Sequence, residues 1–138
     1  MTDIPKPANF EWVRARSECS YQHVFKELEN GVRGDVESVK SLLIPGSPIR
    51  YSVTPLERGR FSVVRAEADD SFRDSVDFIL ANGAITAQDD DNTFRHTATL
   101  TLDNEGKCKL KVGNNELDQW QFRRMALEKL FFAPRRSS

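Results

Sequence analysis

The chain has 138 residues, which is the size of one ordinary domain and too short for two. It carries 20 Lys and Arg against 21 Asp and Glu, and 38% of its residues are hydrophobic, a composition typical of globular rather than disordered chains. The net charge of -1 argues against a dedicated binder of nucleic acid or acidic membranes, because such affinity comes from clustered excess Lys and Arg.

No segment has the pattern of a targeting signal or a membrane span. Residues 1–9 lack the apolar core of a secretory signal. Apolar runs such as Phe78 to Ala81 are far shorter than the roughly 20 residues of a spanning helix. Cys19 and Cys108 lie far apart and neither belongs to a CxxC pair. These features favour a cytoplasmic protein with reduced thiols, although sequence alone leaves a disulfide open.

The chain divides into one domain with two loose ends. We expect residues 1–9 to form a flexible arm, residues 10–132 a single α+β domain, and residues 133–138 a flexible basic tail. At the start of the domain, Phe10 and Trp12 alternate as strand residues do, which predicts a short edge strand or an extended segment.

A long helix is predicted after Ser20, whose hydroxyl can accept hydrogen bonds from the first free amides of a helix. Gly31 and Gly34 each weaken this helix by about 1 kcal/mol relative to Ala, so its packing must hold it. The segment from Pro45 to Pro48 ends it. Apolar residues recur at three- or four-residue spacing along the helix: Val24, Leu28, Val32, Val36, Val39 and Leu43.

About six strands follow, because the apolar pattern changes to strand alternation. Asn82-Gly83 is the favoured pair for a two-residue hairpin turn. Short turn-like connections favour an antiparallel meander over parallel crossovers, which need a dozen or more residues. Threonines and lysines alternate with the apolar residues of the last two strands and predict a polar outer face. The expected strands lie at 49–53, 61–66, 76–80, 85–87, 94–102 and 108–112.

A second long helix is predicted after the strands, capped by Asn114 or Asn115. Its apolar residues cover a broad arc and comprise Leu117, Trp120, Phe122, Met125, Leu127, Leu130, Phe131 and Phe132. Placing both helices on the same face of the sheet buries all apolar faces in one core, so we predict an α+β two-layer sandwich.

Two groups of residues resemble metal ligands without the spacing of a metal site. A thiolate and an imidazole suit zinc, and the candidates are Cys19, His23, His96 and Cys108. However, His96 and Cys108 fall on the apolar faces of their strands, which predicts a place in the core. The acidic run Asp89 to Asp91 lacks the Gly and distal Glu of a calcium loop, and it is interpreted as a solvated turn. No metal or cofactor is predicted.

Catalytic motifs are absent from the sequence. It contains neither the GxSxG of a nucleophile elbow nor the GxGxxG or GxxxxGK[ST] of phosphate loops, and only two histidines could serve as a base. We therefore assign no catalytic residue, and the sequence favours a noncatalytic protein over an enzyme without a recognisable motif.

The number of large aromatic residues is high for one small core. If part of the last helix is uncovered, the remainder forms an apolar patch, and such patches mark interfaces. We predict a noncatalytic cytoplasmic module that binds a protein partner or a second copy through this helix or the outer sheet face. The alternative is a small-molecule-binding protein with an apolar pocket between sheet and helices. The candidate interface residues are Trp12, Trp120, Phe122, Arg123, Arg124, Phe131 and Phe132.

Overall fold

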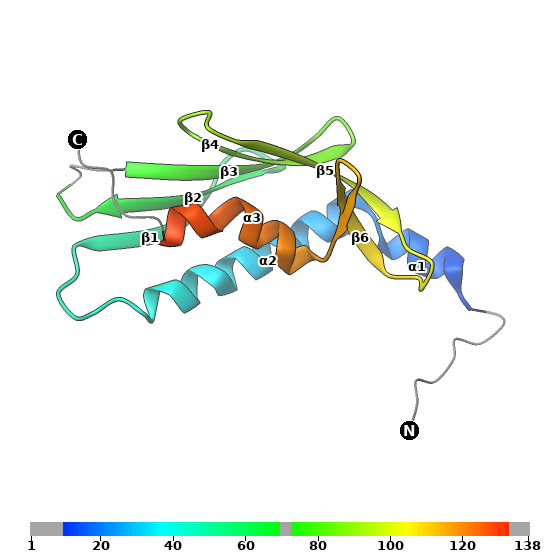
Figure 1. The fold of residues 1–138 in the computed structure, drawn as a ribbon, viewed down its shortest axis with the longest axis horizontal. Coiled ribbons are helices and arrows are strands. Elements are labelled where there is room, and N and C mark those ends of the chain that lie inside the picture. The colour runs from blue at the N-terminus through cyan, green and yellow to red at the C-terminus, as the bar shows by residue number, and fades with distance from the viewer. Residues whose placement is uncertain (1–9, 70–72, 133–138) are drawn as a thin grey trace, which may run out of the picture.

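The computed structural model describes residues 10–69 and 73–132, so the predicted arm at 1–9 and tail at 133–138 lie outside the described residues. A twisted open sheet forms one layer, and the helices α2 and α3 lie side by side against one of its faces (Figure 1). The elements are α1 (Trp12–Glu18), α2 (Tyr21–Lys40), β1 (Ile49–Pro55), β2 (Arg60–Glu67), β3 (Arg73–Ala81), β4 (Ala84–Asp89), β5 (Arg95–Leu102), β6 (Cys108–Val112), β7 (Asn115–Leu117) and α3 (Gln119–Phe132).

The sheet is an antiparallel meander in which each strand pairs with the next one along the chain, in the order β1 to β7. The predicted fold class, an α+β two-layer sandwich with both long helices on one face, is confirmed. The turn at Asn82-Gly83 is also confirmed, because Ala81 pairs with Ala84 and the two turn residues have φ values of 55° and 68°.

Helix α2 begins where its sequence predicts. The hydroxyl of Ser20 accepts a hydrogen bond from the N–H of His23 at 3.3 Å, which satisfies one of the free amides of the first turn. The side chains buried along α2 are those of the predicted apolar stripe from Val24 to Val39, with Phe25 beside them. The stripe packs on the sheet, which offsets the weak helix propensity of the two glycines.

The segment predicted as an edge strand is instead the short helix α1, so that prediction was wrong. None of its residues is buried, so no contact with the core favours a strand with alternating buried and exposed side chains. Local contacts of helical spacing are present instead. Arg14 Nε lies 3.2 Å from Glu18 Oε1, and Arg16 Nη1 donates to the Cys19 carbonyl at 3.0 Å.

Helix α3 is not capped by Asn114 or Asn115, so this prediction was also wrong. Gly113, with a φ of 61°, starts a tight turn that folds Asn115–Leu117 back onto β6 as β7. The helix starts after Asp118, whose carbonyl accepts from the N–H of Gln121 at 3.0 Å and whose own N–H donates to Gln121 Oε1 at 2.8 Å.

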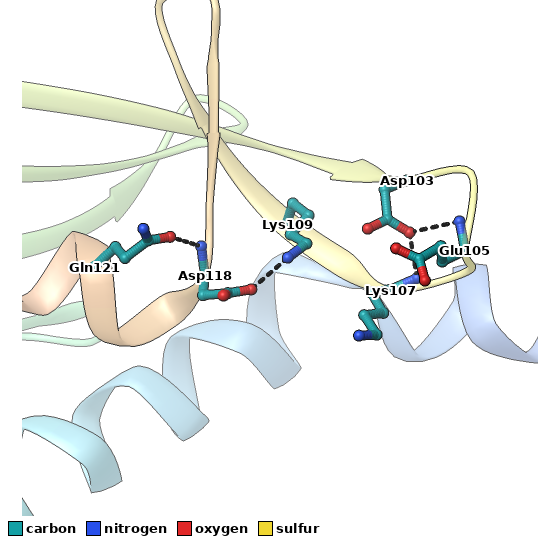
Figure 2. Close-up of polar contacts among 6 residues, drawn as sticks. All are labelled: Asp103, Glu105, Lys107, Lys109, Asp118 and Gln121. Atoms are coloured by element: carbon teal, nitrogen blue, oxygen red, sulfur yellow. Dashed lines mark hydrogen bonds and ion pairs between the residues drawn. The ribbon is translucent and has the colours of Figure 1, made fainter. Parts of the chain in front are cut away.

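Figure 2 shows how the β5–β6 region prepares this helix start. Lys109 of β6 forms an ion pair with the Asp118 carboxylate, which holds the strand against the residue that precedes α3. In the turn before β6, Asp103 Oδ1 accepts from the N–H groups of Glu105 and Lys107 at 2.9 and 2.8 Å. These bonds fix the turn that carries the chain into Cys108.

Cys19 and Cys108 are joined by a disulfide, so the prediction of reduced thiols was wrong. Their Cα atoms lie 5.4 Å apart, within the range that a disulfide spans. Cys19 is buried before α2, whereas Cys108 is exposed at the start of β6, not in the core as predicted. The prediction of reduced thiols was based on the expected cellular compartment. The pairing instead follows from the folded topology, which brings together two cysteines 89 positions apart in the sequence.

Four phenylalanine rings form the centre of the core. Phe25 of α2 lies 5.3 Å from Phe61 of β2, Phe61 stacks on Phe78 of β3 at 4.9 Å, and Phe78 meets Phe122 of α3 edge-on at 6.4 Å, all measured between ring centroids. All four side chains are buried. Because such rings bury large apolar areas, this series ties both helices to the sheet.

The C-terminal end of α3 is fastened to the first two strands. Arg65 Nη1 donates to the Leu130 carbonyl at 3.1 Å, and the Tyr51 hydroxyl donates to the Phe131 carbonyl at 3.2 Å. Burial raises the pKa of Tyr51 against the opposing effect of Arg65, so the phenol keeps the proton that it donates. These bonds satisfy carbonyls that have no partner within the helix, and the Arg65 cation suits the negative end of the helix dipole.

At Gly31, side chains of α3 lie directly against the backbone of α2. A Cβ at this position would lie 2.5 Å from Arg123 Nη1. Two hydrogen bonds hold the Arg123 guanidinium in this place: Nε donates to Asp35 Oδ2 and Nη1 donates to Gln119 Oε1, both at 2.7 Å. Gly34, three residues along α2, would meet nothing within 4 Å.

We therefore expect alanine substitutions at the two glycines of α2 to change the free energy of unfolding by different amounts. Gly34→Ala should raise the free energy of unfolding by about 0.5–1 kcal/mol, because Ala favours the helix and nothing obstructs its methyl group. The free energy of unfolding of Gly31→Ala should be about 1 kcal/mol or more lower than that of Gly34→Ala, because the new methyl group displaces the Arg123 guanidinium from its hydrogen bonds. Urea denaturation measures both; equal stabilisation by the two variants would contradict this packing.

Within residues 10–69 and 73–132, no helix combines the length and the apolar character that crossing a membrane requires.

Candidate functional site

The candidate site is a groove of about 410 Å³ between α2 and α3, here called the α2–α3 groove. Its floor is apolar and buried, with Val39 from α2 and Leu127 from α3. Its remaining lining residues are Asp35, Ser38, Leu42, Trp120, Arg123, Arg124, Glu128, Phe131 and Phe132. The two helices run in the same direction along the groove (Figure 1).

Three large apolar side chains of the groove are exposed to water. Trp120 is 52% exposed, Phe132 is 65% exposed, and Leu42, just beyond the end of α2, is 69% exposed. Exposed apolar surface costs about 25 cal/mol per Å² relative to a buried state. Their gathering around one depression is therefore the feature expected of a binding surface rather than of a solvated helix face.

The charged groups of the groove are paired with one another. Arg123 and Asp35 link α3 to α2 across the floor, with 2.7 Å between Nε and Oδ2. Arg124 and Glu128 form a more exposed pair on α3, with 3.2 Å between Nε and Oε1. The groove thus has an apolar floor and a rim of balanced charge, which is the general anatomy of a protein interface.

The structure brings together five of the seven predicted interface residues: Trp120, Arg123, Arg124, Phe131 and Phe132 all line the groove. Phe122 is 0% exposed and faces the core, so no partner can reach it. Trp12 is 64% exposed but lies on α1, apart from the groove lining.

The α2 wall of the groove was missed by sequence reasoning. Its exposed apolar residue is Leu42, and its floor residue is Val39. The sequence did contain a signal for this wall. Leu42 and Leu43 are adjacent, so they cannot lie on the same face of a helix, and if Leu43 faces the core then Leu42 is a large apolar residue outside it.

The residues considered for metal binding occupy structural positions. Both cysteines are in the disulfide, so neither offers a thiolate. His23 Nε2 lies 3.4 Å from Glu27 Oε1 on the surface of α2. His96 is half-buried and stacks on Phe94 with 5.0 Å between ring centroids.

The acidic turn after β4 is organised by Asp89. Its Oδ1 accepts from the N–H of Thr93 at 2.7 Å and from that of Phe94 at 3.2 Å, and its Oδ2 accepts from the Thr93 hydroxyl. Burial alone would raise the pKa of Asp89, but these hydrogen bonds outweigh it and hold the pKa below its usual value. The surface carboxylates of Asp74, Asp90 and Asp91 lie within 4.8 Å of one another, and we assign them no ligand.

The sheet face opposite the helices is mostly polar, and several of its polar side chains contact one another. Arg60 Nη2 lies 2.6 Å from Asp77 Oδ2, and the hydroxyls of Thr86 and Thr97 are 3.3 Å apart. The alternating threonines and lysines of β5 and β6 lie on this face, with Lys109 held by Asp118. This face offers a partner less exposed apolar surface than the groove does.

The fold and the groove together define the chain as an α+β two-layer sandwich with an exposed apolar groove between its two long helices. No protein-family model, no curated protein and no solved structure matches the chain. Its function is therefore inferred from the chemistry of the groove.

Proposed function

We propose that the chain is a noncatalytic protein-binding module whose α2–α3 groove receives the apolar face of a helix from a partner protein. The observation that carries this proposal is the exposure of Trp120, Phe132 and Leu42 around one apolar floor. Tryptophan is enriched among the residues that dominate binding energy, because it buries a large area and loses little rotamer freedom.

The dimensions of the groove suit a helix. Trp120 and Phe132 lie at its two ends along α3, and 12 residues of helix rise about 18 Å. A partner helix of about three turns spans that length with apolar anchors at i, i+3 or i+4, and i+7. The exposed pair of Arg124 and Glu128 offers both charges at the rim, so the polar flank of an amphipathic helix finds a partner of either sign.

The alternative, a small-molecule-binding protein, draws on the groove volume, since about 410 Å³ falls within the range of ligand sites. The predicted location of that pocket was between the sheet and the helices. There the buried rings of Phe25, Phe61, Phe78 and Phe122 pack against one another and occupy the centre of the layer, which supports the protein-binding proposal over this alternative.

Trp120→Ala tests the proposal, with Trp12→Ala as the matched control. Both tryptophans are more than half exposed, but only Trp120 lines the groove. Native mass spectrometry of the protein purified from its host identifies bound chains. Helices of a bound chain, made as synthetic peptides, are then titrated against the three proteins. We expect Trp120→Ala to weaken binding of one amphipathic peptide about tenfold or more, with Trp12→Ala unchanged.

Two results would contradict the proposal. One is equal affinity of the peptides for the wild type and Trp120→Ala. The other is a small organic molecule as the only bound mass, released by Trp120→Ala, which would favour the alternative.

The cytoplasmic location stays a prediction. The disulfide between Cys19 and Cys108 favours an oxidising compartment instead, because such bonds are rare where glutathione keeps thiols reduced.

A further inference from the structure

Strand β1 is an open edge of the sheet, and its outward backbone groups can be identified. The Leu56 N–H donates to the Arg60 carbonyl at 3.1 Å, and the Pro48 carbonyl accepts from the Ala68 N–H at 2.8 Å. Because bonding direction alternates along a strand, the even-numbered residues of β1 point their N–H and C=O groups toward β2. The odd-numbered residues point theirs away from the sheet.

Two donors on this edge have no partner in the part of the chain that the structure describes: the N–H groups of Tyr51 and Val53. The N–H of Ile49, also on the edge, donates to the Ser47 hydroxyl at 3.2 Å. An unpaired row of this kind is a template for another strand.

The usual protections of an edge strand are weak in β1. It pairs regularly with β2 over seven residues, its only charged residue is Arg50, and its only proline, Pro55, is its last residue. Natural edges are commonly blunted by charges, bulges, interior prolines or short length. The opposite edge, β7, has three residues and is protected by its shortness.

The space beside β1 is accessible and electrically balanced. A groove of about 420 Å³ separates the edge from α2, with Val36 in its wall. The two cations of that wall are paired within the chain, since Arg33 Nη2 lies 2.8 Å from Glu29 Oε2 and Lys40 Nζ lies 3.3 Å from Glu37 Oε2. A second copy of the chain therefore meets no excess of like charge there.

We propose that β1 pairs antiparallel with β1 of a second copy, about a two-fold axis at Tyr51. In this register the N–H of each Tyr51 donates to the Tyr51 carbonyl of the other copy, and each Val53 N–H donates to the Ile49 carbonyl. Pro55 lies outside the paired stretch. Arg50 stands opposite Ser52 of the second copy, so no like charges oppose each other. The contact is self-complementary, as a two-fold interface must be. It does not involve the α2–α3 groove.

Sedimentation velocity over a concentration series tests this pairing. Arg50 and Ser52 are exposed, so Ser52→Arg leaves the fold intact but places two arginines opposite each other, twice in each dimer. We expect the dimer Kd to rise about tenfold in Ser52→Arg. The double variant Ser52→Arg with Arg50→Glu should restore the wild-type Kd, because opposite charges then face each other.

Val53→Pro supplies a second test, since it removes an outward N–H that makes no bond within the sheet. It should raise the dimer Kd about tenfold or more, with thermal unfolding checking that the variant is folded. Trp120→Ala should leave the dimer unchanged. The proposal is overturned by a wild type that stays monomeric throughout the series, by a dimer insensitive to Ser52→Arg, by failure of the double variant to rescue, or by loss of the dimer in Trp120→Ala.

Discussion

Replacing both half-cystines, Cys19→Ser together with Cys108→Ser, is expected to lower the free energy of unfolding by about 2–5 kcal/mol. The disulfide joins residues 89 positions apart and so constrains a large part of the unfolded chain. It also ties the junction of α1 and α2 to the start of β6. For a domain whose total stability is about 5–15 kcal/mol, this is a large share.

Urea denaturation with and without dithiothreitol measures this effect. Reductant should bring the wild type down to the stability of the double variant, and the double variant itself should not respond. Cys108 is exposed, which gives the reductant access to the bond even though Cys19 is buried. If the wild type keeps its full stability when alkylation shows both thiols to be free, the bond makes no contribution and the expectation is wrong.

Phe122→Ala is expected to lower the free energy of unfolding by about 3–5 kcal/mol. The side chain is fully buried and meets the Phe78 ring edge-on at 6.4 Å, so its removal leaves a cavity between α3 and the sheet. Phe122 resembles the groove residues in sequence, but its position assigns it to folding rather than to binding.

The matched comparison is Trp120→Ala, two residues earlier on α3. Although tryptophan is the larger side chain, its 52% exposure limits the expected loss to about 1 kcal/mol. Chemical denaturation of both variants under the same conditions should separate them by several kcal/mol. Similar losses, or a larger loss for Trp120→Ala, would mean that α3 presents a different face to the sheet.

The elements that sequence predicted well are those with long periodic patterns. The stripe from Val24 to Val39 repeats over several turns, and the Ser20 cap marks its start, so α2 was predictable from local physics. The hairpin at Asn82-Gly83 was predictable because both turn residues need positive φ. Short turns between alternating strands then left a meander as the simplest topology.

The elements that sequence missed are short or depend on distant contacts. Helix α1 buries no side chain and β7 has only three residues, so neither has a repeating pattern of apolar residues from which it could be predicted. The disulfide and the groove depend on how the elements pack. Leu42 belongs to the groove only because the end of α2 lies beside Phe132, and no local pattern encodes that proximity.

The order of elements along the chain has a consequence for biosynthesis. Helix α3 follows strands β1 to β7, yet it supplies Phe122 to the aromatic centre and receives hydrogen bonds from Tyr51 of β1 and Arg65 of β2. Until α3 has been made and has docked, the part of the meander's apolar face that it covers stays exposed. Chains in this state are prone to aggregate, because their exposed apolar surface and unpaired strand edges can meet those of other chains.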